Sequence, residues 1–242
     1  MNHKTIHLKK IDSTNDYALR NMAKLEAEIT IYADEQTAGK GRNNRTWISS
    51  QKSNLYFTII LKPDLKKFTV LPNITQYMAI VICRILEKYE IIAQIKWPND
   101  ILVDGKKIAG ILCETVFKGS NLEGIALGVG VNLNMSEDFL AIIDQPATAL
   151  NVLLGKRINR RKFLDILLDE FFENYESFLL QGFVCIRDEY KQKLISLNKS
   201  VKINMLDEIS EGIIRNIDLI GQLILEQKNK QKIIVNVGDV IL

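Results

Sequence analysis

The first third of the chain carries hydrophobic patterns that predict two helices and two strands. A start at 13–16 that resembles a capping box precedes apolar residues at helical spacing, which predicts a helix over about 14–24. Alternation with a period of two predicts a strand over 29–33, and the apolar run at 55–61 predicts another. Apolar residues at helical spacing over 74–85 predict a buried helix between two stretches of sheet.

The middle of the chain has the pattern of an antiparallel sheet around a tight turn. Asp104-Gly105 separates apolar runs at 101–103 and 107–112, and this dipeptide between such runs is a strong signal for a β-hairpin. A long strand over 122–133 follows the turn at 119–121. Antiparallel strands with interspersed helices predict an α+β fold with a mixed, largely antiparallel central sheet and flanking helices.

The last quarter of the chain changes character. Helical patterns occupy about 160–180 and 184–196. Short apolar runs separated by turn residues then predict strands at 201–203, 211–217, 222–225 and 232–237. We therefore expect a larger domain over residues 1–196 and a small all-β domain over residues 197–242.

Composition narrows the class of protein. With 242 residues, of which 47% are hydrophobic and 25% charged, the chain has the composition of a globular protein and not of a disordered one. No apolar run approaches the roughly 18 residues that span a bilayer, and no signal peptide is visible, so we expect a cytoplasmic protein that does not enter membranes. A net charge of +3 gives no global reason to expect a nucleic-acid partner.

The histidines and cysteines exclude several kinds of chemistry. His3 and His7 are the only histidines, which argues against a catalytic triad and against HExxH zinc chemistry. Cys83, Cys113 and Cys185 lie far apart and are odd in number, so we expect reduced, mostly buried thiols and no metal site.

The segment 39–47 is the sharpest candidate for chemistry. Gly39 and Gly41 permit close approach of the backbone to a ligand, and Lys40, Arg42 and Arg45 add three cations without an acid among them. This composition favours phosphate binding, although the spacing is not that of a Walker A loop. The alternative is a solvated basic turn.

Two further segments have open interpretations. Gly128-Val129-Gly130 begins like a dinucleotide fingerprint, but Leu133 replaces the third glycine, so these glycines mark close approach either of a neighbouring strand or of a flat ligand. Lys107 adjoins an apolar strand and is either its exposed end or a buried cation, in which case an anion must meet it.

Taken together, these segments closely resemble the bacterial biotin protein ligases, over essentially the whole chain. The matching segments are Asp12-Ser13-Thr14-Asn15, Gln36-Thr37-Ala38-Gly39, Gly39-Lys40-Gly41-Arg42-x-x-Arg45-x-Trp47, Lys96-Trp97-Pro98-Asn99-Asp100, Lys107-Ile108-Ala109-Gly110-Ile111-Leu112 and Gly128-x-Gly130-Val131-Asn132. Lys40 departs from the arginine of many members. The resemblance implies the fold that biotin ligases share with class II aminoacyl-tRNA synthetases, with an SH3-like β-barrel at the C-terminus.

The resemblance also implies a reaction: a carbon–nitrogen ligase that activates biotin with MgATP to biotinyl-5′-AMP and then transfers it to a lysine of the biotin carboxyl carrier protein of acetyl-CoA carboxylase. The implied catalytic residues are Lys107, Arg42 and Arg45. Those implied for biotin are Ser13, Thr14, Asn15, Gln36, Gly39, Lys40, Arg42, Lys107 and Gly110. Those implied for the nucleotide are Arg42, Arg45, Trp47, Asn99, Asp100, Lys107, Gly130 and Asn132.

Several alternatives stay open beside this interpretation. A lipoate or octanoate ligase or transferase shares the implied fold, and a biotin or nucleotide sensor without catalysis is a rival of another class. Because the 13–15 segment begins almost at residue 1, no winged-helix domain and no direct DNA binding are expected. Asp100 either orients the incoming lysine or supports a turn, the C-terminal domain either closes over ATP or docks the carrier, and the protein is a monomer or a homodimer.

Overall fold

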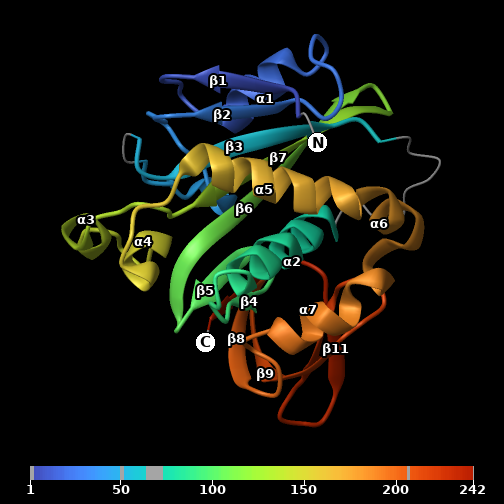
Figure 1. Ribbon diagram of the computed structural model, residues 1–242. Coiled ribbons are helices and arrows are strands. Elements are labelled where there is room, and N and C mark those ends of the chain that lie inside the picture. The colour runs from blue at the N-terminus through green and yellow to red at the C-terminus, as the bar shows by residue number, and fades with distance from the viewer. Residues whose placement is uncertain (1–2, 50–51, 64–72, 206–207, 242) are drawn as a thin grey trace.

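Within residues 3–49, 52–63, 73–205 and 208–241, which the computed structural model describes, a seven-stranded sheet forms the centre of the larger part of the molecule (Figure 1). Its spatial order is β1-β2-β3-β7-β6-β5-β4; β1 and β2 are parallel and every other pair is antiparallel. The prediction of a mixed, largely antiparallel sheet is confirmed. The strands are β1 (Thr5–Leu8), β2 (Thr30–Ala33), β3 (Leu55–Leu61), β4 (Gln94–Lys96), β5 (Asp100–Val103), β6 (Lys106–Lys118) and β7 (Asn121–Val131).

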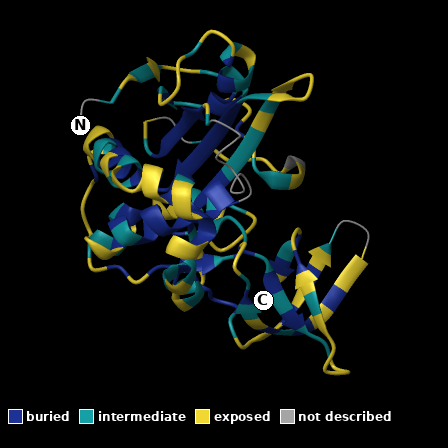
Figure 2. Cartoon of the chain, turned by 90° about the vertical axis from the view of Figure 1, so that its right-hand side faces the viewer, coloured by how far each residue is buried: buried dark blue, intermediate teal, exposed yellow. Residues whose placement is uncertain are grey.

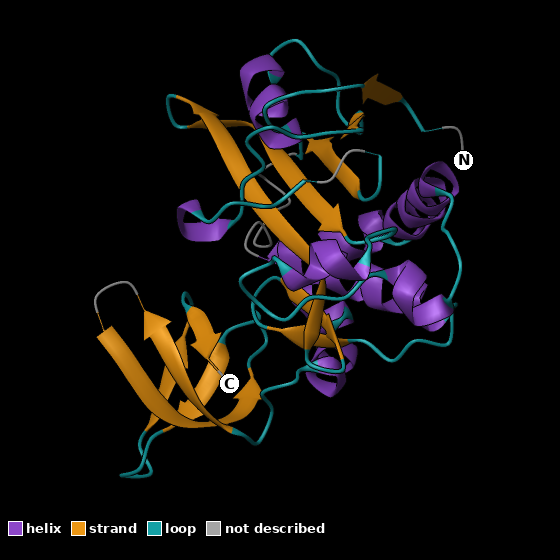
Figure 3. Cartoon of the chain, turned by 90° about the vertical axis from the view of Figure 1, so that its left-hand side faces the viewer, coloured by secondary structure: helices purple, strands orange, loops and turns teal. Residues whose placement is uncertain are grey.

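The two faces of this sheet differ in side-chain size because successive residues of a strand point to opposite sides. On β7, Ile125, Leu127 and Val129 pack into the main core, under the helices α2 (Ile74–Glu87) and α5 (Arg160–Glu173) (Figure 3). The alternate positions are small: Gly124, Ala126, Gly128 and Gly130. Around Ala126, the helix α1 (Thr14–Asn21) covers this second face. The large residues of β7 therefore build the main core, and its small residues let other segments approach the sheet closely.

The helices largely follow the hydrophobic pattern, with corrections at their ends. The side chain of Ser13 caps α1 by accepting a hydrogen bond from the Asp16 amide, but α1 ends at Asn21 and is shorter than predicted. The pattern at 184–196 forms a 3-10 turn and a short helix instead of one helix. The sequence pattern does not predict the short helices α3 and α4 or the strand β1. The remaining helical elements are η1 (Arg42–Asn44), α3 (Glu137–Ala141), α4 (Leu150–Leu154), α6 (Tyr175–Gln181), η4 (Gly182–Cys185) and α7 (Arg187–Lys193).

The hairpin between β5 and β6 is confirmed, and it carries an irregularity next to a functional candidate. Asp104 and Gly105 both have positive φ, 49° and 73°, as a two-residue hairpin turn requires. Beyond the turn, Leu102 pairs with Lys107 whereas Ile101 pairs with Ala109, so β6 holds one extra residue directly after Lys107. Such a bulge changes the direction of neighbouring side chains.

The strands predicted in the last part of the chain form a five-stranded antiparallel sheet. Its order is β11-β10-β9-β8-β12, which agrees with an SH3-like fold; among the residues described, the pairing leaves this sheet open instead of closing it into the expected barrel. One face of the strands is buried and the other exposed (Figure 2). The strands are β8 (Ser200–Met205), β9 (Glu208–Ile217), β10 (Leu223–Glu226), β11 (Lys232–Val235) and β12 (Asp239–Ile241).

Two expectations from composition can be compared with this fold. None of the helices described is long and apolar enough to cross a membrane. All three cysteines are free, but only Cys83 is buried; Cys113 is half-buried and Cys185 is exposed, which corrects the expectation that these thiols are mostly buried. Burial raises the pKa of the Cys83 thiol to about 12.

Candidate functional site

One pocket brings together most of the residues that the sequence singled out. It lies on the small-residue face of the central sheet, between α1, the loop 39–47 and the strand β12 of the C-terminal sheet. The predicted residues that line it are Ser13, Thr14, Asn15, Gln36, Lys40, Arg42, Arg45, Trp47, Asn99, Asp100, Lys107, Gly110 and Gly130.

One part of the pocket lining, the neutral wall, consists of Thr14, Asn15 and Gln36, and the fully buried Thr58 lies behind it. The Thr14 amide donates to Gln36 Oε1 at 2.8 Å, and the Thr58 hydroxyl lies 2.9 Å from Thr14 Oγ1 and 2.6 Å from Asn15 Oδ1. Thr14 and Asn15 are 4% and 3% exposed, at the buried start of α1. Neutral donors and acceptors held in this way suit a polar, uncharged group of a ligand.

The glycines of β6 and β7 leave space for side chains from outside the sheet. A Cβ on Gly128 would collide with the Asn15 amide, and one on Gly130 would collide with the Trp47 indole. A Cβ on Gly110 would lie 2.8 Å from Trp47 Cζ3. Close approach to these strands is therefore made by the Asn15 side chain and by Trp47, which is a third explanation beside the neighbouring strand and the flat ligand that the sequence left open.

Lys107 is a buried cation, and the anion that meets it belongs to the protein. Its Nζ lies 2.7 Å from Asp100 Oδ1, and the two side chains are 15% and 16% exposed. The ammonium also lies 5.2 Å from the centre of the Trp47 ring, within the range of a cation–π interaction. Lys107 precedes the bulge in β6, and Asp100 lies on the antiparallel neighbour β5. Together they hold the Lys107 ammonium close to the Trp47 ring.

The opposite side of the pocket consists of the arginines of the loop 39–47 and an acid from the C-terminal sheet. Arg42 Nη1 lies 2.9 Å from Asp239 Oδ1, and Arg45 Nη2 lies 3.0 Å from Asp239 Oδ2. Arg42 Nη1 also donates to Asn99 Oδ1 at 3.2 Å. We call Arg42, Arg45 and Lys107 the cationic side of the pocket.

Of the remaining predicted residues, Lys40 lines this pocket, whereas Gly39 and Asn132 do not. Lys40 pairs with Asp16 at 2.8 Å, and this hydrogen bond raises the pKa of the Lys40 ammonium. Gly39 closes the stem of the loop, because its carbonyl accepts from the Trp47 amide at 2.9 Å. Asn132 lines the neighbouring pocket beside Trp47 and Lys107, and its amide donates to the Thr148 carbonyl at 3.1 Å.

Sequence reasoning missed several pocket residues. Asp239 and Val240 come from β12, at the far end of the chain, and Gln145 comes from a loop. No local motif marks Asp239, whereas the alternation of glycine with large apolar residues on β7 was a readable signal for Gly128. In the part of the chain that the structure describes, no group of three or more His, Cys, Asp or Glu residues could hold a metal ion.

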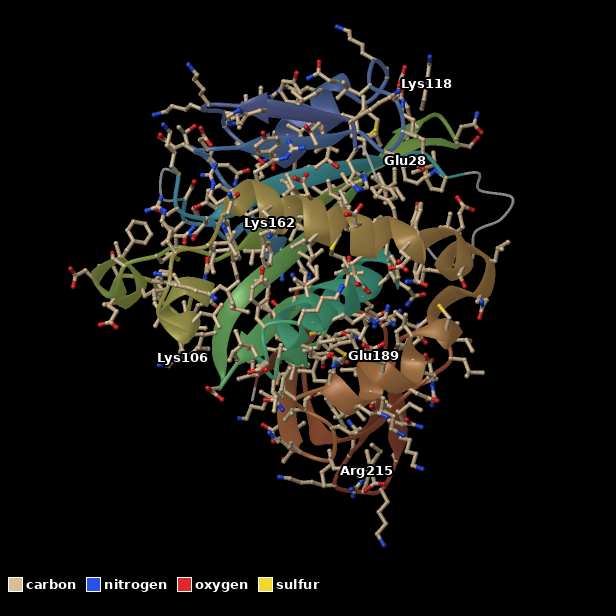
Figure 4. The ribbon with its side chains drawn as sticks, in the orientation of Figure 1. Glu28, Lys106, Lys118, Lys162, Glu189 and Arg215 are labelled. Atoms are coloured by element: carbon tan, nitrogen blue, oxygen red, sulfur yellow. The ribbon has the colours of Figure 1, made fainter. Side chains whose placement is uncertain are left out.

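Lys40 and Lys96 also line this pocket, whereas other cations lie elsewhere on the molecule. Lys118 at the β6–β7 turn and Arg215 on β9 lie at opposite ends of the molecule (Figure 4). The net charge of the whole chain is only +3. The gathering of Arg42, Arg45 and Lys107 in one pocket is therefore a local feature and does not reflect a generally basic protein.

Two family models match the sequence. One is described as the biotin/lipoate A/B protein ligase family and matches residues 8–132. The other is described as the biotin protein ligase C-terminal domain and matches residues 196–242. The first match contains the neutral wall and the cationic side of the pocket, and the second contains Asp239.

Two relatives and one solved structure extend this likeness. The chain is 31% identical to the bifunctional ligase/repressor BirA of Bacillus spizizenii over 198 residues, which are 81% of this chain and 61% of that protein. It is 30% identical to the biotin–[acetyl-CoA-carboxylase] ligase of Paracoccus denitrificans, over 90% of this chain and 92% of that one. The structure of the biotin protein ligase from Aquifex aeolicus in complex with biotin and ATP superposes with a TM-score of 0.83 at 26% identity, covering 98% of this chain and 97% of the other.

Proposed function

The chain belongs to the biotin/lipoate A/B protein ligase family, and from this premise we propose that it is an ATP-dependent biotin protein ligase. A carboxylate oxygen of biotin bonds to the α-phosphorus of ATP while the bond from that phosphorus to pyrophosphate breaks. The amine of a carrier lysine then bonds to the acyl carbon, the bond to AMP breaks, and the amine loses a proton. The product is an amide between biotin and a biotin carboxyl carrier protein.

The observation that carries this proposal is the meeting of a neutral wall and a cationic side in one pocket. Biotin has an uncharged ureido ring at one end and a carboxylate at the other, so its ends require different surroundings. Thr14, Asn15 and Gln36 suit the ring, whereas Lys107 and the arginines suit the carboxylate and the phosphates. Ser13, Gly39, Lys40 and Gly110 complete the proposed biotin site.

Charge neutralisation is the main catalytic task in the first step. The biotin carboxylate is ionised at neutral pH and needs no general base, but it must approach a polyphosphate of the same sign. Lys107 would stabilise negative charge at the α-phosphate, and Arg42 and Arg45 would hold the polyphosphate and afterwards the adenylate. Mg²⁺ bound to ATP would neutralise part of the polyphosphate charge, beside Lys107, Arg42 and Arg45 of the protein.

The proposed nucleotide site continues past Trp47 into the neighbouring pocket. Trp47, Asn99, Asp100, Gly130 and Asn132 belong to it. Asn132 lines that neighbouring pocket together with Arg45 and Lys107, which favours contact with the base or the ribose there. We further propose that the loop 39–47 closes over the adenylate and excludes water.

Asp100 has a proposed role in the second step. In this structure its carboxylate pairs with Lys107 at 2.7 Å. Once the adenylate phosphate engages Lys107, the carboxylate becomes available to orient the incoming lysine and to accept its proton.

Intact mass spectrometry tests the proposal directly. The protein is incubated with biotin, MgATP and a biotin carboxyl carrier domain, and a second carrier has its acceptor lysine changed to arginine. The expected result is pyrophosphate release and the mass of one biotinyl group on the first carrier only. Transfer of lipoate or octanoate instead of biotin would favour the related ligases, and ligand binding without pyrophosphate release would indicate a sensor.

Several wider features belong to the same proposal. We place the catalytic unit at residues 1–196 and the small domain at 197–242, and we expect a cytoplasmic enzyme, monomeric or homodimeric, without direct DNA binding. Two residues of the small domain, Asp239 and Val240, line the pocket. Their position favours a role of this domain in closing the nucleotide site.

A further inference from the structure

We propose that Asp239 is a positioning residue of the nucleotide site, through which the C-terminal strand β12 sets the orientation of Arg42 and Arg45. The inference rests on the proposed function, because that function assigns the two arginines to the phosphates of ATP and of the adenylate. It makes the small C-terminal sheet part of the adenylation machinery without requiring it to touch the nucleotide.

The carboxylate of Asp239 receives three donors from one short loop. Its Oδ1 pairs with Arg42 Nη1 at 2.9 Å, and its Oδ2 pairs with Arg45 Nη2 at 3.0 Å. Asn43 Nδ2 donates to the same Oδ2 at 3.1 Å. Two arginines that lie three positions apart in the sequence are thereby held side by side.

The carboxylate of Asp239 is carried by a paired strand, whereas the arginines belong to the segment 39–47. Asp239 is paired with Asn204 in the antiparallel ladder of β12 and β8, and its side chain is only 18% exposed. The loop is fixed at its stem by backbone bonds, such as Gly41 N to the Arg45 carbonyl at 2.7 Å, but these bonds do not orient a guanidinium. Asp239 contacts both guanidinium groups and so contributes to the orientation of each.

Arg42 can keep these contacts and still bind a phosphate. Besides Asp239, it donates to Asn99 Oδ1 and to the Gly238 carbonyl, each at 3.2 Å. A guanidinium has five N–H donors in a fixed plane, so donors remain for a ligand once this geometry is set. Arg45 is 68% exposed and is anchored to Asp239 at one Nη atom.

Steady-state pyrophosphate release by the full-length protein tests the proposal, with biotin and MgATP as substrates. D239N keeps the shape of the side chain and removes its charge, and E208Q is the matched control on an exposed position of the same sheet. We expect D239N to raise the KM for ATP about 10- to 100-fold, since misplaced catalytic groups cost factors of this size. The dissociation constant for biotin and the melting temperature should match those of E208Q.

A second measurement separates positioning from a merely structural role. The effect of D239N is measured both in the parent protein and in the R45Q variant. In R45Q the fold-increase of the KM for ATP should be at least about threefold smaller than in the parent, because one of the two arginines that Asp239 orients is already gone. A structural defect of the C-terminal sheet would act equally in both backgrounds. D239E, which restores a carboxylate, should return the KM to within about fivefold of the parent value.

Two results would overturn the inference. An unchanged KM for ATP in D239N would show that the arginines need no anchor, and a lowered KM would show that Asp239 competes with phosphate instead of preparing its site. Both require that the parent protein releases pyrophosphate; absence of pyrophosphate release by the parent would contradict the proposed function itself.

Discussion

At the neutral wall, Thr14, Asn15 and, behind them, Thr58 are buried and joined by short hydrogen bonds, whereas on the cationic side Arg42, Arg45 and Lys107 are each paired with a carboxylate of the protein. The neutral groups lie at the start of a helix and on a central strand, and hydrogen bonds among them fix their geometry. The cations lie on a loop and beside a bulge, and their partners are Asp100 and Asp239.

This difference has an energetic reason. A neutral hydrogen-bonding group can be buried once its partners are present, but a buried charge requires a counter-charge. In this structure the counter-charge of the partly buried Arg42 and Lys107 is a carboxylate, and in the proposed reaction it is a phosphate. The neutral wall therefore provides shape, and the cationic side provides charge that changes partners during the reaction. Three variants test this division, and a fourth tests an ion pair that supports the start of α1.

Removal of the Lys107 ammonium should have the largest effect. We expect K107A to lower the rate of adenylate formation about 10²- to 10³-fold, the usual cost of losing one group that stabilises developing charge. Biotin binding should stay within about tenfold of the parent value, because Lys107 acts mainly on charge at phosphorus. Pyrophosphate release and biotin calorimetry measure the two quantities, with K106A at the exposed neighbouring position as control.

Loss of Arg42 should release the adenylate prematurely. We expect R42G to raise its dissociation rate about 50-fold, since a hydrogen bond to a charged group contributes about 1.5–3 kcal/mol. Free adenylate would then label unrelated proteins, which a streptavidin blot with added albumin detects. R215G is the control far from the pocket, and equal background labelling by R42G, R215G and the parent would contradict the proposed contact.

Overpacking of the neutral wall should affect biotin and spare ATP. A methyl group at position 128 would collide with the Asn15 amide, so G128A should weaken biotin binding about tenfold, within the usual cost of overpacking. The KM for ATP should change much less. A variant that loses both affinities equally would show that the two sides of the pocket are not independent.

The smallest effect concerns an ion pair that supports the start of α1 from outside the pocket. Hydrogen bonds from Arg20 lower the pKa of Asp12 to about 2, and one Asp12 oxygen also accepts from the Ser13 amide at 2.8 Å. Because solvent screens this half-exposed pair, D12N should cost only about 0.5–1 kcal/mol of unfolding free energy at pH 7.

The pH dependence of this difference has a definite sign. The carboxyl titrates near 3.9 in the unfolded chain and lower in the folded one, so its stabilisation is complete above about pH 4 and is lost as the pH falls toward 2. Urea titrations of parent and D12N should therefore converge in acid. A difference that grows below pH 4 would contradict this assignment.

Much of the fold was accessible from local patterns. The Asp104-Gly105 turn, the apolar run of β3 and the helical spacing of α2 each depend on neighbours in sequence, and each is confirmed. Errors occurred where the local signal was weak or tertiary contacts decided. The four-residue strand β1 is held by parallel pairing with β2, and α1 ends at Asn21 although apolar spacing continues to Leu25.

The sequence by itself determined which chemical groups are present: two glycine-bearing strands, a basic loop, a neutral Ser-Thr-Asn segment, and almost no imidazole. Only the tertiary structure decided which groups face one another. Asp239 lies 197 positions from Arg42 along the chain and 2.9 Å from it in space, and the anion beside Lys107 is Asp100 from the adjacent strand. Composition fixes the number of charges, but the pairing of charges depends on distance, and distances between remote residues exist only after the chain has folded.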